Sequence, residues 1–233
     1  MEKNNLNNQT DRRRFLGTIT ASAATIGLGS LLQPLQASAD AGIPGQTIDD
    51  ADEWFKKVKG KHKIVFDATE PHDVFPFAWP RVFLLTNEKT GTPANDCGVV
   101  VVLRHAAIGY ALEDKLWKKY NLGEMFKADD PDTKKPSSRN PFWQPKPGAF
   151  KVPGIGEIQI GINELQSSGV MFCVCNAALT VYSAVAADML KMSAADAYKD
   201  FAAGVLPGIQ VVPSGVWALG RAQERGCGYI FAG

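Results

Sequence analysis

The chain has 233 residues, with 25 Lys and Arg against 24 Asp and Glu, so its formal net charge is only +1. A nearly neutral protein lacks the strongly basic surface by which nucleic acid or an anionic membrane is bound as the main partner. The length is sufficient for one domain with a well-formed hydrophobic core.

Residues 1–39 are typical of an export signal. The sequence DRRRFLG at 11–17 closely resembles the twin-arginine motif, and residues 15–39 carry no charge. The segment ends in Ala37-Ser38-Ala39, the small-x-small pattern that a signal peptidase accepts. We therefore expect residues 1–39 to be a signal peptide that the twin-arginine (Tat) translocase reads, with the periplasm as destination. The alternative is a membrane anchor of 25 uncharged residues, although Gly, Ser and Thr dilute its apolar character.

Cleavage after Ala39 would remove four basic and two acidic residues and leave a mature chain of net charge −1. The periplasm is oxidising, so disulfides are permitted there. The mature chain keeps all four cysteines, which are Cys97, Cys173, Cys175 and Cys227.

The mature chain begins with a leader at 40–61 that holds a short amphipathic helix near 50–58. An α/β domain is expected over 62–233. Its first strand is KIVFD at 63–67, followed by a helix that Pro76 and Pro80 delay or kink and that ends near Asn87. The run GVVVVLRH at 98–105 is apolar throughout, as in a strand buried on both faces, and a helix is expected over 106–120.

Residues 121–150 form an insertion rich in Pro, Lys and Ser, which predicts a long loop. Phe126, Phe142, Trp143 and Phe150 lie in or beside it, and this is too much aromatic surface for a freely solvated linker. Three interpretations stay open: a loop held on the surface by its aromatic side chains, a lid over a site, or a contact between subunits.

The second half of the chain continues the alternation of helices and strands. The expected helices are 156–168, 177–191, a further helix with Ser193 as its N-cap, and 214–226. The expected strands are 170–175, 208–212 and 227–231. This pattern predicts an α/β fold with a mainly parallel sheet of about five strands and helices on both faces. Ligands of such sheets bind just beyond the carboxyl ends of the strands.

Polar side chains follow the carboxyl ends of four predicted strands, so they are expected to share one edge of the sheet. They are Asp67, Arg104, His105, Cys175, Asn176 and Ser214. Cys175 also stands where a helix begins, and free amides and the helix dipole at that point lower the pKa of a thiol. These features favour a reactive Cys175.

Cys173 lies one strand period before Cys175 and is expected to point to the same face, deeper along the strand. An inert core thiol is one interpretation of either cysteine. A disulfide between the two would be strained. A metal clamp would need further ligands, for which only His105 and His72 are candidates. Cys97 and Cys227 both start strands, and they could form a disulfide only if their strands are neighbours.

The run GVMFCVCNAAL at 169–179 and the sequence LPGIQVVPSGVWALGRAQERGCGYIFAG at 206–233 closely resemble the end of DsrE/DsrF-like proteins. KIVFDATEP and VVVVLRH are similar to the first two strands of that family. The resemblance implies a three-layer α/β/α sandwich assembled as a homo-oligomer, a trimer or a hexamer. It also implies that Cys175 carries sulfur as a persulfide and that His105 matches a histidine often found after the second strand.

The chain departs from the family pattern at the long 121–150 insertion, at Ala177-Ala178 and at the additional Cys173. The expected function is periplasmic sulfur handling, as a persulfide carrier or with sulfurtransferase-like activity. Cys175 and His105 would act on the sulfur, and Asn176, Arg104, Asp67 and Ser214 would bind the substrate. Partners would be a small sulfur species or a sulfur-donor protein, with no cofactor and no metal. The alternatives are a non-enzymatic module that binds a small ligand or metal, and an oligomeric scaffold subunit.

Overall fold

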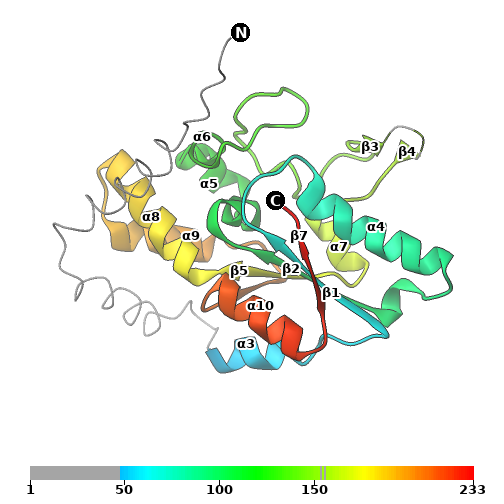
Figure 1. Cartoon of the computed structure of the whole chain (residues 1–233). Helices are drawn as coiled ribbons and strands as arrows, with labels where there is room; N and C mark the ends of the chain where they lie inside the picture. Colours follow the sequence, from blue (N-terminus) through cyan, green and yellow to red (C-terminus); the bar gives the residue numbers. More distant parts are fainter. Residues whose placement is uncertain (1–47, 153, 155) are drawn as a thin grey trace, which may run out of the picture. The chain divides into compact units, whose positions relative to one another are not determined.

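A five-stranded, wholly parallel sheet organises the described part of the chain, which is residues 48–152, 154 and 156–233 of a computed structural model (Figure 1). The strand order is β6-β5-β2-β1-β7, and each neighbouring pair is parallel. The strands are β1 (His62–Ala68), β2 (Cys97–Leu103), β5 (Met171–Cys175), β6 (Ile209–Val212) and β7 (Gly228–Phe231). The signal peptide predicted at 1–39 lies outside the described residues.

The strands form where the sequence has short apolar runs rich in Val, Ile and Phe. β2 lies in the middle of the sheet and is buried at every position, as its unbroken apolar run predicts. β7 is an edge strand, and all four of its residues are exposed. Helices cover both faces, so the fold is the predicted three-layer α/β/α sandwich.

One face of the sheet packs against α3 (Ile48–Phe55) and α10 (Gly215–Glu224), which lie together in Figure 1. Ala51 and Phe55 of α3 and Ala218 of α10 are completely buried in this core. Val65 of β1, Val100 of β2 and other residues at alternate positions of the strands point to this face and belong to the same core. The amphipathic helix predicted near 50–58 therefore exists, and its apolar side chains belong to the core of the domain.

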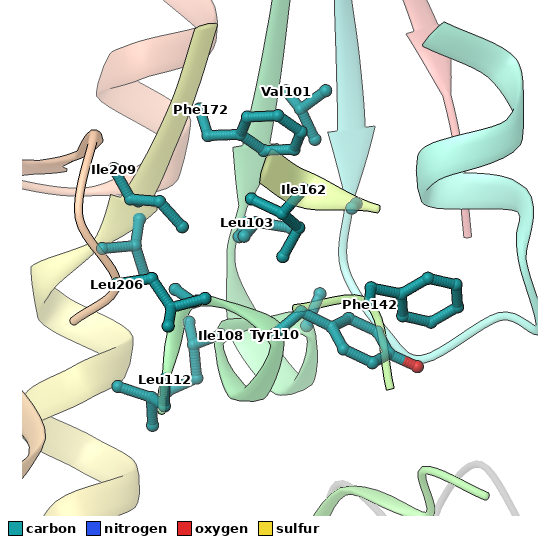
Figure 2. Close-up of a cluster of buried hydrophobic side chains, with 14 of the residues drawn as sticks. Val101, Leu103, Ile108, Tyr110, Leu112, Phe142, Ile162, Phe172, Leu206 and Ile209 are labelled. Carbon is teal, nitrogen blue, oxygen red and sulfur yellow. The ribbon is translucent and has the colours of Figure 1, made fainter. Parts of the chain in front are cut away.

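The opposite face carries the larger core. Figure 2 shows Val101, Leu103 and Phe172 of the strands turned toward the helical layer. The helices of this layer and of its flank are α4 (Phe75–Lys89), the 3-10 helix η2 (His105–Ala111), α5 (Asp114–Lys119), α6 (Leu122–Phe126), α7 (Ile162–Ser167), α8 (Asn176–Leu190) and α9 (Ala194–Ala203). A short 3-10 turn, η1 (Ala94–Asp96), precedes β2.

Two helix predictions are wrong in extent. The segment 106–120 is not one helix, because η2 ends at Ala111 and α5 starts at Asp114. Leu112 between them makes a β-bridge with Val205, and this tertiary pairing interrupts the helix. The helix predicted from 156 starts only at Ile162, because β4 (Gly156–Glu157) pairs with β3 (Lys151–Val152) as a small antiparallel hairpin.

The 121–150 insertion is held to the domain by its aromatic side chains. Phe142 is buried and stacks on Phe77 of α4 at 4.3 Å between ring centroids, and on Phe150 at 5.1 Å. The Asn140 side-chain amide donates to the carbonyls of Tyr110 and Leu112, at 2.8 and 3.0 Å. The insertion is therefore a packed part of the second core and includes the one-turn helix α6.

Candidate functional site at the carboxyl ends of the strands

Cys175 is the last residue of β5 and the N-cap of α8. Its Sγ accepts a hydrogen bond from the backbone N–H of Ala178, at 3.3 Å. At this position the sulfur lies at the first turn of α8, at the positive end of the helix dipole, where a backbone N–H is directed at it. The sequence placed Cys175 at such a strand-to-helix junction, and the structure has it there.

The Cys175 thiol is free but has little contact with solvent, since the residue is only 7% exposed. It packs among the residues of the larger core, including Ala178 and Leu179. A reagent that reaches this sulfur must therefore be small, or the surrounding side chains must move. The thiol is thus part of the larger core, at the point where α8 begins.

The other three cysteines lie away from this junction. Cys173 is completely buried in the core under α3 and α10, whereas Cys175 packs with the opposite core, so the expected common face is wrong. The chain turns into α8 at Cys175, which reorients its side chain. Burial raises the pKa of the Cys173 thiol strongly. All four cysteines are free, and β1 separates the strands of Cys97 and Cys227, so the condition for their disulfide is not met.

Asp67 and Arg104 are brought into direct contact beside this thiol. Arg104 Nε and Nη2 donate to the two carboxylate oxygens of Asp67, at 2.6 and 2.9 Å, and the Tyr229 hydroxyl donates to Asp67 Oδ2 at 2.8 Å. Asp67 is 1% exposed, so this is a buried carboxylate with a planar two-point ion pair. The pairing of Leu103 with Val174 places Arg104 next to Cys175.

The pKa of Arg104 is raised, chiefly by its hydrogen bonds to Asp67. Gly215, at the start of α10, packs on the Arg104 side chain, and a Cβ added there would lie 2.5 Å from Arg104 Cβ. The absence of a side chain at Gly215 thus lets α10 approach the arginine.

His105 follows Arg104 and has a left-handed backbone conformation, with φ of 50°. This region is unfavourable for a residue with a Cβ, and such outliers gather at functional sites. The imidazole is exposed, and its Nε2 shares a hydrogen bond with the Tyr182 hydroxyl at 3.1 Å. Burial raises the pKa of Tyr182, so this hydroxyl stays protonated in neutral solution.

Asn176 and Ser214 have structural partners. The Tyr198 hydroxyl donates to Asn176 Oδ1 at 2.7 Å, which ties the start of α8 to α9. Ser214 is the N-cap of α10, and its hydroxyl accepts from the backbone N–H of Trp217 at 3.2 Å. Of the six predicted residues, Asp67 and Arg104 are in direct contact, and Arg104 follows the residue that pairs with Val174, just before Cys175.

Three tyrosines were missed by the sequence reasoning, and each holds one predicted residue through its hydroxyl: Tyr229 holds Asp67, Tyr182 holds His105 and Tyr198 holds Asn176. Tyr182 lies seven residues after Cys175 on α8, a helical spacing that places it on the same side of that helix as the thiol. No comparable local signal links Tyr229 to Asp67, which is 162 residues away.

A cavity of about 410 Å³ lies elsewhere in the domain, between α4, the end of the insertion and the hairpin. Its lining includes Arg81, Leu85, Pro145, Phe150, Glu157 and Glu164. Over the residues that the structure describes, no group of three His, Cys, Asp or Glu side chains is arranged to hold a metal ion. Within the same residues, every helix is too short or too polar to cross a membrane.

A scan against known protein families finds no match to this chain, and a search of curated proteins finds no significant relative. The resemblance to DsrE/DsrF-like proteins therefore stays a prediction from the quoted motifs.

Proposed function

We propose that this protein handles sulfur in the periplasm, after export by the twin-arginine route, and that it carries sulfur as a persulfide on Cys175. The observation that carries the proposal is the hydrogen bond from the Ala178 N–H to Cys175 Sγ at the start of α8. The same amides that stabilise a thiolate also stabilise a persulfide anion, which is more acidic than a thiol.

The chemistry can be written for thiosulfate as the sulfur donor. The Cys175 thiolate attacks the outer sulfur of thiosulfate, and a sulfur–sulfur bond forms to Cys175. The sulfur–sulfur bond of thiosulfate breaks, and sulfite leaves with the electron pair. Arg104, next to Cys175 in the register, would orient the anionic donor, and His105 would accept the proton when the resting thiol ionises.

The limited exposure of Cys175 favours a small sulfur species over a bulky one as the direct donor. It also protects the thiol from irreversible oxidation, which follows exposure and thiolate character. Both properties suit a carrier that works in an oxidising compartment.

The test is to offer thiosulfate or polysulfide to the purified protein and to measure its intact mass and peptide map. The expected result is a gain of one or more sulfur atoms on Cys175, which a reductant removes. A Cys175→Ser variant should gain none, and the matched Cys173→Ser variant should behave like the wild-type protein. If no added sulfur maps to Cys175, the proposal is wrong.

A second candidate is the binding of a small ligand without sulfur chemistry, and the cavity beside Arg81 favours it. This cavity combines apolar walls at Leu85 and Phe150 with charged groups of both signs. Native mass spectrometry would detect a retained ligand. A Cys175→Ala protein that keeps the ligand, together with no sulfur loading of the wild type, would favour this candidate.

A further inference from the structure

The cavity of about 410 Å³ beside α4 is built by separate segments of the chain. Arg81 and Leu85 lie four residues apart on α4, so they face the same side of that helix. The end of the insertion, residues 145–150, and residues 157–159 after the hairpin supply the other walls, with α7 beside α4 (Figure 1). The insertion is where the chain departs from the DsrE/DsrF-like pattern, so the resemblance does not imply this cavity.

The apolar walls of the cavity are held in place by the fold itself. Phe150 is buried and stacks on Phe142, and the Ile158 N–H donates to the Phe150 carbonyl at 3.0 Å. Leu85 borders the same space from α4. Small-molecule sites are typically cavities of roughly 300–1,000 Å³ with mainly apolar walls and a few polar groups that orient the ligand. The cavity therefore suits the apolar body of a small organic molecule.

Arg81 brings a positive charge to the cavity. Its Nε donates to the carbonyl of Gln159 at 2.5 Å, its Nη1 to Ser168 Oγ at 3.0 Å and its Nη2 to the carbonyl of Glu164 at 3.4 Å. These three acceptors are uncharged, and a guanidinium has five N–H groups in all. Two N–H groups therefore have no acceptor within the described part of the chain. Burial lowers the pKa of Arg81, and a desolvated charge of this kind favours an anion beside it.

The other charged groups of the cavity indicate that the ligand carries one negative charge. The Glu157 carboxylate forms an ion pair with Lys151 at 3.4 Å, and Glu164 Oε2 accepts from the backbone N–H at the N-cap of α7 at 2.8 Å. Among the residues that the structure describes, neither Arg81 nor Lys146 forms an ion pair with a carboxylate. A ligand with several negative charges would be repelled by the two glutamates.

We propose that this cavity binds a small organic monocarboxylate, with its carboxylate on Arg81 and its apolar body against Leu85 and Phe150. A guanidinium and a carboxylate match in shape and charge, and hydrogen bonds between them are stronger than those between neutral groups. The inference rests on the second candidate function above, for which it names the class of ligand. It does not depend on sulfur chemistry, because Cys175 does not line the cavity.

The first test is isothermal titration calorimetry of the purified full-length protein with three probes: phenylpropionate, the matched neutral phenylpropionamide and inorganic phosphate. We expect saturable binding of the acid at millimolar concentration or below, and no binding of the amide or of phosphate. Absence of binding of the acid, or equal binding of the amide, overturns the proposal. Binding of phosphate in preference to the acid would assign the cavity to a polyanion and would equally overturn it.

The second test uses paired variants to place the acid in the cavity. Arg81→Gln should raise the Kd about tenfold or more. Lys89→Gln removes a charge from the same helix outside the cavity and should leave the Kd unchanged. Leu85→Glu keeps the hydrogen bonds of Arg81 but places a carboxylate one turn away from it, so it should abolish binding. Its control is Val82→Glu, which lies outside the cavity at a similar exposure, 41% against 39%.

Thermal unfolding of each variant verifies that the fold is retained, and Leu85→Glu keeps the test decisive if Arg81→Gln does not fold. A folded Leu85→Glu or Arg81→Gln protein that binds the acid as the wild type does contradicts the proposal. Sulfur loading of Cys175 is measured on the same preparation. A protein that loads sulfur but does not bind the acid refutes this inference alone, and one that binds the acid but loads no sulfur refutes only the persulfide proposal.

Discussion

Replacement of Asp67 by Ala is the most direct test of the polar group beside Cys175. The change removes a carboxylate that is 1% exposed and leaves two donors without their acceptor, the Arg104 guanidinium and the Tyr229 hydroxyl. Removal of one partner is more costly than loss of the attraction alone, because the groups that remain lose their acceptor and must be satisfied by water.

The magnitude follows from the burial of the two partners. Loss of one member of a fully buried ion pair costs about 3–5 kcal/mol. The Arg104 side chain is 28% exposed, so water can recover part of its solvation and the expected cost is about 2–3 kcal/mol. For a protein of this size that is a fall in Tm of roughly 5–10 °C, at about 2–4 °C per kcal/mol.

Urea denaturation followed by circular dichroism measures this free energy of unfolding. Tyr229→Phe removes only one hydrogen bond to Asp67 and should cost about 1 kcal/mol. Asp188→Ala is the control, because its ion pair with Lys191 is highly exposed and should contribute less than about 0.5 kcal/mol. If Asp67→Ala is no less stable than the control, the ion pair between Asp67 and Arg104 does not contribute to the stability of the fold.

Three further outcomes are expected. Phe142→Ala should cost about 3–5 kcal/mol in denaturation because the ring is buried and stacked, whereas Phe231→Ala on the exposed edge should cost less than about 1 kcal/mol. Hydrogen bonding from Lys119 lowers the pKa of Asp200 below 3.8, so its contribution to stability is present above that pH and is lost as the pH falls through the lowered value. The difference in Tm between wild type and Asp200→Asn should therefore be largest above pH 5 and vanish at lower pH. Cys173 should stay unmodified by iodoacetamide at pH 8 in the folded protein, as judged by peptide mapping, because burial raises its pKa; labelling of Cys173 before unfolding would contradict its position in the core.

The sheet could be predicted from the sequence because its strands are short apolar runs bounded by turns and helices. β2 and β5 are clear in this respect, since a run such as CGVVVVL has no periodic polar position. The break between η2 and α5 could not be predicted, because Leu112 pairs with Val205 and the Glu113 N–H bonds to the carbonyl of Gly204. Local periodicity carries no information about partners so far along the chain.

The same distinction applies to the candidate site. The rule for parallel sheets correctly placed Asp67, Arg104 and Cys175 at one edge, because only the order of strands and helices was needed. The rule could not show that the Asp67 carboxylate forms an ion pair with Arg104. The hydroxyls that hold Asp67 and His105 come from residues 162 and 77 positions away, and only the folded chain brings them there.

The groups around Cys175 determine how the proposed persulfide anion would be stabilised. Arg104 is the nearest cation in the register, but its Nε and Nη2 are occupied by Asp67, so the pair as a whole is neutral. A neutral pair next to the sulfur acts over a shorter range than a free guanidinium would. The Ala178 N–H at the start of α8 is, in contrast, a direct donor to Cys175 Sγ at 3.3 Å. The proposed persulfide would therefore depend more on the geometry of this one helical turn than on the net charge of the site.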